Sequence, residues 1–185
     1  IDFPSGYIPH RFFLERIKEG PVLVIGDFSG RDYPAIREKI GEAYMVDVAP
    51  TNFASGKYFV RQTIEKPLPF PPRFFKAILM TEVLEHIWED KRALTELRKV
   101  LTDDGLLLLS VPFWSDFHDR HYHIYSPRTI RLVFLHAGYE IIETSYRGIA
   151  VSTPNWLAAL LALAIRPFWK EKALMKINEM FYKLH

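Results

Sequence analysis

Short apolar runs alternate along the chain with segments in which apolar residues recur at helical spacing. Most of the runs lack polar alternation, which is typical of strands covered on both faces in a parallel sheet. The expected strands cover residues 22–25, 43–46, 58–60, 77–80, 106–111 and 139–144. Strands and helices in this order predict an α/β fold with a doubly wound, mostly parallel Rossmann-like sheet and helices on both faces.

The segments between the strands carry helix start and stop signals. Ser126 is a suitable N-cap and Pro127 follows it at the first helical position, while Gly138 ends the apolar stripe. Two further helices are expected to begin at the capping residues Asp32 and Asp90. In an open sheet of this kind, ligands bind beyond the carboxyl ends of the strands.

The length of 185 residues, 49% of them hydrophobic, corresponds to one domain with a sizeable core. We expect a single domain over residues 1–185, with a core at about 20–146 and a C-terminal helical appendage at about 154–185. A net charge of +2 predicts no dedicated nucleic-acid surface, and the lack of cysteine excludes thiolate chemistry. No signal peptide is visible, so the expected location is cytoplasmic.

The first candidate site is the turn between the first strand and the first helix. Gly26 and Gly30 bracket this turn, where glycine permits positive φ and lets the backbone approach a ligand. Asp47 stands at the carboxyl end of the second strand, 21 residues after Gly26. A carboxylate there can accept hydrogen bonds from both hydroxyls of a ribose, so the combination indicates a ligand of the adenosine type.

The charges near this turn favour a cationic ligand. Asp27 and Asp32 flank the turn and would repel a pyrophosphate, although Arg31 partly offsets them. The third glycine of the dinucleotide-binding motif is also absent. S-adenosylmethionine carries a sulfonium and an ammonium group and therefore fits better than NAD, which makes a nucleotide-dependent oxidoreductase the least favoured function.

A Glu-Val-Leu-Glu-His segment follows the fourth expected strand at residues 82–86. Further landmarks come in order at 67–70, 94–105, 110–112, 125–127 and 137–139. Over roughly residues 20–146 the chain thereby resembles the class I S-adenosylmethionine-dependent methyltransferases, particularly their small-molecule group. The resemblance implies S-adenosylmethionine as cofactor and one antiparallel edge strand. Together with the charge argument, it implies a cofactor site formed by Gly26, Asp27, Gly30, Asp47, Gln62, Thr63 and Thr81.

Four positions depart from the family pattern at places interpreted as facing the cofactor. The family usually has an acidic residue at Val24, a glycine at Phe28 and an aspartate at Lys76. The acidic residue that often faces the adenine amine is replaced near Gln62 or Thr63. These departures leave a degenerate, non-catalytic binding or partner module as the alternative to an enzyme.

Histidines at two places are candidates for a catalytic base. Methyl transfer to a hydroxyl benefits from a base, and His86 follows the fourth strand. His118, His121 and His123 crowd the loop after the fifth strand, which we expect to overlook the acceptor pocket. A metal site formed by these three is not expected, because no regular structure places all three on one face. A purely structural role is the competing interpretation for each histidine.

The family core does not account for the C-terminal segment. Residues 156–165 form an uninterrupted apolar run of ten residues, about half of the ~20 that cross a bilayer as a helix. The residues that follow, 174–184, have the pattern of an amphipathic helix. We expect these helices to pack on the sheet, form a dimer contact, roof an acceptor site or lie on a membrane surface. The leading prediction is methyl transfer to a small-molecule acceptor, which is lipid-like if these helices roof the site or lie on a membrane surface.

Overall fold

Four α-helices and five strands make up the regular structure in the part of the chain that the structure describes. This computed structural model describes residues 8–27, 30–112 and 120–144. The helices are α1 (Ile8–Arg16), α2 (Asp32–Ile40), α3 (Asp90–Val100) and α4 (Pro127–His136), and the 3-10 turns are η1 (Gly56–Tyr58) and η2 (Leu84–His86). The strands are β1 (Val22–Ile25), β2 (Ala43–Asp47), β3 (Phe59–Arg61), β4 (Phe75–Thr81) and β5 (Leu101–Ser110).

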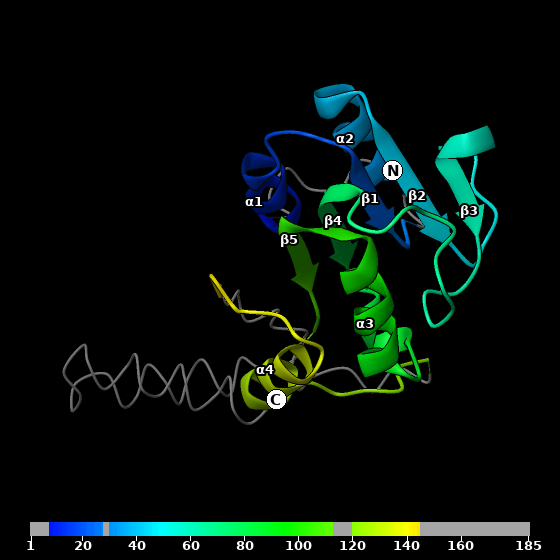
Figure 1. The fold of residues 1–185 in the computed structure, drawn as a ribbon. Coiled ribbons are helices and arrows are strands. Elements are labelled where there is room, and N and C mark those ends of the chain that lie inside the picture. Colours follow the sequence, from blue (N-terminus) through cyan, green and yellow to red (C-terminus); the bar gives the residue numbers. More distant parts are fainter. Residues whose placement is uncertain (1–7, 28–29, 113–119, 145–185) are drawn as a thin grey trace, which may run out of the picture.

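The five strands form one parallel sheet in the order β3-β2-β1-β4-β5 (Figure 1). This arrangement confirms the expected Rossmann-like α/β fold. The expected antiparallel edge strand is not among the described residues, and the expectation of a strand over 139–144 is wrong. A strand needs a hydrogen-bonded neighbour, whereas Glu143 in this segment forms a bidentate ion pair with Arg16 of α1 at 2.8 and 3.0 Å.

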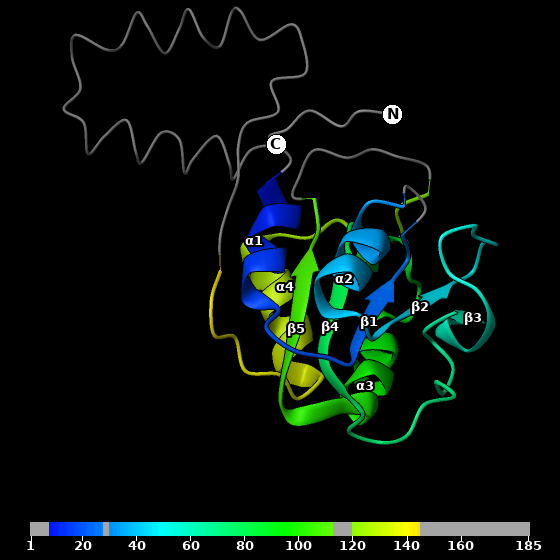
Figure 2. The ribbon, with the colours of Figure 1, turned by 90° about the horizontal axis from the view of Figure 1, so that it is seen from above.

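Both faces of the sheet are covered, which explains why its strands lack polar alternation. Figure 2 shows α1 and α2 on one side of the sheet and α3 and α4 on the other. Leu23 and Ile25 of β1 belong to the hydrophobic cluster that includes α3 and α4. Val22 and Val24 belong to the cluster that includes α1 and α2. Because successive side chains of a strand point to opposite faces, β1 is buried along its whole length.

The Asp-Asp-Gly segment at residues 103–105 lies inside β5, where the pairing with β4 is irregular. Phe75 pairs with Leu101, whereas Ala77 pairs with Leu106, so the ladder between β4 and β5 is interrupted over the residues between these pairs. A bulge accommodates extra residues without ending the strand. The regular pairing of β5 then starts at Leu106, where the apolar run begins.

Of the three residues expected to cap helices, Ser126 is the one that occupies the N-cap position. The Ser126 hydroxyl accepts the N–H of Thr129 at 3.1 Å, and the Thr129 hydroxyl accepts the N–H of Ser126 at 2.8 Å, which forms a capping box for α4. Asp32 and Asp90 are instead the first residues of α2 and α3, where a carboxylate interacts favourably with the helix dipole.

The expected C-terminal helices, Phe28 and His118 lie outside the described residues, so the division into a core and an appendage stays a prediction. Among the helices that are described, none is both long and apolar enough to span a bilayer.

Candidate functional site

The turn between β1 and α2 is fixed by a close contact with the segment after β4. Gly26 has a φ of +63°, a left-handed conformation that favours glycine. A Cβ atom at Gly26 would come within 2.8 Å of Cγ2 of Val83, so the contact excludes a larger residue. The N–H of Gly26 donates to the carbonyl of Val46 at 2.9 Å. Gly26 therefore joins the carboxyl ends of β1, β2 and β4.

Asp27 holds the first turn of α2. Its buried carboxylate accepts the backbone N–H groups of Arg31, Asp32 and Tyr33 at 3.0, 2.9 and 2.7 Å. These N–H groups have no partner within a helix, so Asp27 caps α2 from outside. Its negative charge stays next to the turn while its oxygens bond the helix. A direct contact between Asp27 and a cofactor stays a prediction.

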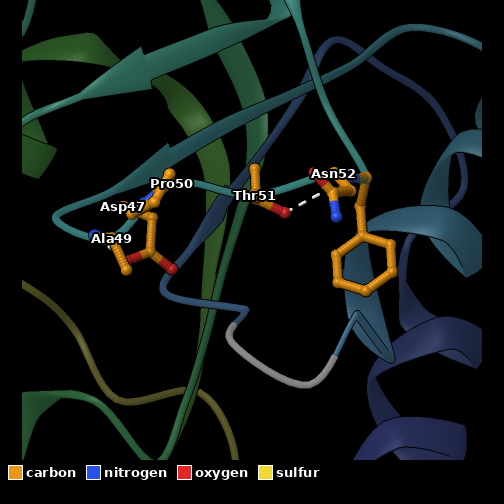
Figure 3. Close-up of a pocket in the computed structure, with 6 residues that line it drawn as sticks. Asp47, Ala49, Pro50, Thr51 and Asn52 are labelled. Carbon is orange, nitrogen blue, oxygen red and sulfur yellow. Dashed lines mark hydrogen bonds between the residues drawn. The ribbon is translucent and has the colours of Figure 1, made fainter.

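A pocket of about 240 Å³ lies at the carboxyl end of β2 (Figure 3). Its lining consists of Asp47, Ala49, Pro50, Thr51, Asn52 and Phe53. Oδ1 of Asp47 accepts the N–H of Ala49 at 2.8 Å, which orients the half-buried carboxylate beside the pocket. Within the described segments no residue donates to the second oxygen of Asp47. The site thus offers one carboxylate oxygen to the hydroxyl groups of a ligand.

Phe53 lies over Gly30 at the far end of the glycine turn. Gly30 has a φ of +65°, and a Cβ atom there would overlap with the Phe53 ring. The ring is 45% exposed, so it forms an outer wall of the pocket. The sequence analysis missed Phe53, because a single aromatic residue in a loop carries no pattern.

Gln62 and Thr63 follow β3 beside Asp47. The N–H of Gln62 donates to the carbonyl of Asp47 at 3.0 Å, which brings the expected adenine and ribose positions together. Nε2 of Gln62 donates to the carbonyl of Pro67 at 3.1 Å, and the Thr63 hydroxyl donates to Glu65 at 2.9 Å. Both side chains therefore close the loop after β3, and their contact with adenine is untested.

Thr81 ends β4 with a buried hydroxyl that makes no hydrogen bond to any described residue. The side chain is 7% exposed. Across the ladder, the Ser110 hydroxyl donates to Oε1 of Glu82 at 2.6 Å, and the N–H of Glu82 donates to the Ser110 carbonyl at 3.0 Å. An unsatisfied buried polar group costs about 1–3 kcal/mol. The hydroxyl of Thr81 is therefore available to a ligand at this edge.

His86 and His121 meet beyond the carboxyl end of β4. Their rings pack edge to face at a centroid distance of 4.5 Å. Nδ1 of His86 lies 3.0 Å from the carbonyl oxygen of Arg120. The carboxylate of Glu85 joins the pair, because one ligand atom from each of Glu85, His86 and His121 lies within 4.8 Å of the others. Two of the expected catalytic histidines thus come together, with a carboxylate that the sequence analysis did not include.

His123 contacts different groups. Its Nε2 lies 3.0 Å from the carbonyl oxygen of Trp88 and 3.9 Å from Oδ2 of Asp90. The ring stacks on that of Tyr125, whose hydroxyl donates to Asp90 at 3.0 Å. Burial and the neighbouring Asp90 charge raise the pKa of Tyr125 well above its ordinary value, so Tyr125 stays a neutral donor. His123 helps to hold the start of α3, and its catalytic role stays a prediction.

Val24 and Lys76, two of the positions that depart from the family pattern, make contacts within the fold. Val24 is 1% exposed in the core. Lys76 lies at the amino end of β4, opposite to the end that carries Thr81, and its Nζ pairs with Asp104 at 3.2 Å. The interpretation of Lys76 as a cofactor-side position is therefore wrong.

Residues 25–109 of the chain match the model of a methyltransferase domain family. The match runs from the last residue of β1 into β5 and includes the glycine turn, Asp47, Thr81 and η2. Among curated proteins, none matches the chain.

Solved structures with a similar fold include several methyltransferases. The YcgJ protein from Bacillus subtilis is 20% identical, with a TM-score of 0.62 over 70% of this chain and 67% of that chain. An S-adenosylmethionine-dependent methyltransferase from Aquifex aeolicus is 23% identical, with a TM-score of 0.58 over 71% of this chain and 79% of that chain. The Burkholderia thailandensis 1,6-didemethyltoxoflavin-N1-methyltransferase, solved with 1,6-didemethyltoxoflavin and S-adenosylhomocysteine, is 20% identical, with a TM-score of 0.58 over 72% and 68% of the two chains.

These likenesses show the Rossmann-like α/β fold of methyltransferases. The match of residues 25–109 supports methyl transfer as the general activity of the chain.

We expect Thr81→Val to leave the thermal unfolding temperature unchanged or higher, because it removes an unsatisfied buried hydroxyl and keeps the side-chain shape. If Thr81 bonds the expected cofactor, the same variant weakens the binding of S-adenosylmethionine by about 2- to 10-fold, the loss of one hydrogen bond. Calorimetry with and without the ligand measures both quantities. Thr95→Val, on the exposed side of α3, is the control, and equal affinities of the two variants would exclude the contact.

Glu65 makes stability depend on pH. The N–H of Glu89 donates to Glu65 at 2.8 Å and holds the pKa of its carboxyl below the ordinary value of 4.5. A lowered pKa in the folded state contributes stability above pH 4.5, and this contribution is lost as the pH falls through the lowered value. Urea unfolding at pH 7 and below 4.5 should therefore show a smaller acid-induced loss in Glu65→Gln than in the parent chain. Glu38→Gln, an exposed carboxylate of α2, should behave like the parent.

Proposed function

We propose that the chain transfers a methyl group from S-adenosylmethionine to a small-molecule acceptor. The observation that carries this proposal is the carboxylate of Asp47, which stands beside a pocket with one oxygen that no described residue uses. The pocket adjoins a glycine turn within the part of the chain that matches a methyltransferase domain. We infer the cofactor and the class of acceptor from the chemistry of the residues at this edge of the sheet.

The residues at this edge fit the cofactor in chemistry. The carboxylate of Asp47 suits the ribose hydroxyls, and the hydroxyl of Thr81 is a further polar group without a hydrogen-bond partner among the described residues. The charge of Asp27 next to the turn favours a cationic rather than an anionic ligand. At about 240 Å³ the pocket is smaller than the ~300–1,000 Å³ typical of ligand sites, so it accounts for the nucleoside part alone. The rest of the ligand would occupy the space next to the Phe53 ring.

S-adenosylmethionine supplies a methyl group on a positively charged sulfur, which becomes a neutral thioether when the carbon–sulfur bond breaks. The new bond forms between the methyl carbon and the acceptor atom, and a hydroxyl acceptor passes its proton to a base. The protein contributes mainly by holding the reactants together and excluding water, effects worth up to ~7–11 kcal/mol. His86 or His121 supplies an imidazole nitrogen at this edge as the base.

The surface around these histidines supports a flat, partly apolar acceptor. Trp88 and Tyr122 are both exposed and pack edge to face, with ring centroids 5.2 Å apart. Tyr122 directly follows His121, so the aromatic pair borders the proposed base. A lipid-like acceptor, a membrane or dimer contact of the C-terminal helices, and a cytoplasmic location stay predictions.

The alternative is a binding module without turnover. The observation in its favour is the Phe53 ring over Gly30, which covers one end of the glycine turn and narrows the space for a ligand. In this case the fold is kept and the full cofactor does not enter.

Asp47→Asn tests the proposed cofactor site. It keeps an oxygen for the N–H of Ala49 but removes the charge that strengthens the bonds to ribose, so we expect affinity to fall about 10-fold or more. Isothermal titration with S-adenosylmethionine and S-adenosylhomocysteine should show the same loss for both, because both carry the ribose. Asp104→Asn, an exposed residue paired with Lys76, removes the same charge elsewhere and should bind like the parent. A parent chain that binds neither ligand at millimolar concentration contradicts the proposal.

Phe53→Ala distinguishes between the two proposed functions, an enzyme and a non-catalytic binding module. If the ring forms a wall of a working site, its loss weakens S-adenosylhomocysteine binding by up to about 10-fold through lost apolar contact. If the ring blocks the site, the parent chain does not bind and Phe53→Ala does. Leu135→Ala, an exposed apolar residue of α4, controls for unspecific effects. We expect the first result.

A further inference from the structure

Glu85, His86 and His121 form a cluster of metal-ligating side chains that the proposed cofactor site does not use. Glu85 and His86 belong to η2, directly after β4, and His121 comes from the segment before α4, 35 residues after His86. One ligand atom of each lies within 4.8 Å of the other two. The cluster combines two imidazoles and one carboxylate, a ligand set that catalytic zinc sites use.

Backbone hydrogen bonds on both sides of His121 hold the cluster together. On one side, the carbonyl of Arg120 contacts Nδ1 of His86 at 3.0 Å. On the other side, the N–H of Tyr122 donates to the carbonyl of Glu85 at 2.8 Å. His121 is therefore placed opposite η2 by the main chain, so the meeting of the three side chains is built into the fold.

The contact with Arg120 also orients the His86 ring. A carbonyl oxygen only accepts, so Nδ1 of His86 donates to it, and Nε2 is the ring nitrogen that is left to bind a metal. Metal-binding histidines almost always donate their other ring N–H to a carbonyl or carboxylate, which fixes the ring for ligation. His86 has this arrangement with the carbonyl of Arg120.

The burial pattern fits a cation that is reached from solvent. The side chain of Glu85 is 1% exposed, whereas His86 is exposed and His121 is half-buried. A carboxylate in such a position loses hydration, and a cation next to it offsets this cost. Two ligands of a tetrahedral zinc ion, each ~2.0–2.1 Å from the metal, lie roughly 3.4 Å apart. The three ligand atoms here lie within 4.8 Å of one another, so metal binding requires the side chains to move closer together.

We propose that Glu85, His86 and His121 bind one divalent transition-metal cation of the zinc class. Two imidazole ligands favour zinc or cobalt over magnesium, which prefers oxygen ligands. Three protein ligands leave one coordination position for water or another small ligand. The proposal does not depend on S-adenosylmethionine binding, because none of the three side chains lines the pocket at Asp47.

Metal titration of the untagged chain tests the proposal. After treatment with a chelator and dialysis, the chain is titrated with zinc chloride by calorimetry and with cobalt chloride by visible absorption. We expect one saturable site per chain, the absorption bands of tetrahedral cobalt, and a higher unfolding temperature with zinc. His86→Gln and His121→Gln should each weaken zinc binding by more than ~10-fold. Loss of a residue that only supports a metal ligand already costs about that much, and these variants remove a ligand itself.

Two control variants locate the site. His123→Gln changes the histidine two residues after His121, and the ring of His123 contacts the carbonyl of Trp88. His136→Gln changes an exposed histidine of α4. Both should bind zinc like the parent chain, and circular dichroism checks that all variants are folded. The proposal is overturned if the parent chain binds no zinc, or if both cluster variants bind as tightly as the controls. Because no titration contains S-adenosylmethionine, neither result depends on the methyltransferase proposal.

Discussion

The contact between Gly26 and Val83 is the constraint on which both candidate sites depend. β1 and β4 are neighbours in the sheet, and the chain leaving β1 passes so close to Val83 that position 26 has no space for a side chain. Val83 leads directly into η2, which carries Glu85 and His86. The same contact therefore sets where the turn towards α2 begins and where the histidine cluster lies. A larger residue at position 26 would displace one of the two.

The carboxylates at this edge act in two different ways. Asp27 caps α2 with its oxygens, and its charge stays next to the glycine turn. Coulomb interaction falls off only as the inverse of the distance, and a buried charge is weakly screened. Asp27 can therefore act on a ligand through its charge, while its direct contact with a cofactor stays a prediction. Asp47 acts by contact, because its position at the end of β2 leaves an oxygen beside the pocket.

Local patterns predicted the elements whose signals lie within one segment. β1 has the expected bounds, because four consecutive apolar residues fill both faces of the sheet. α4 begins after Ser126 and ends before Gly138, since capping chemistry is local. The segment 139–144 has an apolar pattern but pairs with none of the described strands, and α1 lacks a clear apolar stripe. The cluster of Glu85 with His121 could not be predicted from the sequence, because main-chain contacts between segments distant in the sequence bring these residues together.

A cation in the histidine cluster changes the chemistry that the cluster can perform. A histidine nitrogen whose lone pair binds a metal cannot accept a proton, so ligation and general-base catalysis exclude each other at the same atom. His86 has one such nitrogen, because its Nδ1 is held by the carbonyl of Arg120. Under the proposed function, His86 of an empty cluster would be a base oriented by the main chain. With zinc bound, a water on the cation would take that role, because the metal lowers the pKa of its bound water towards neutrality. The metal content of the chain would then decide which group removes the proton from a hydroxyl acceptor.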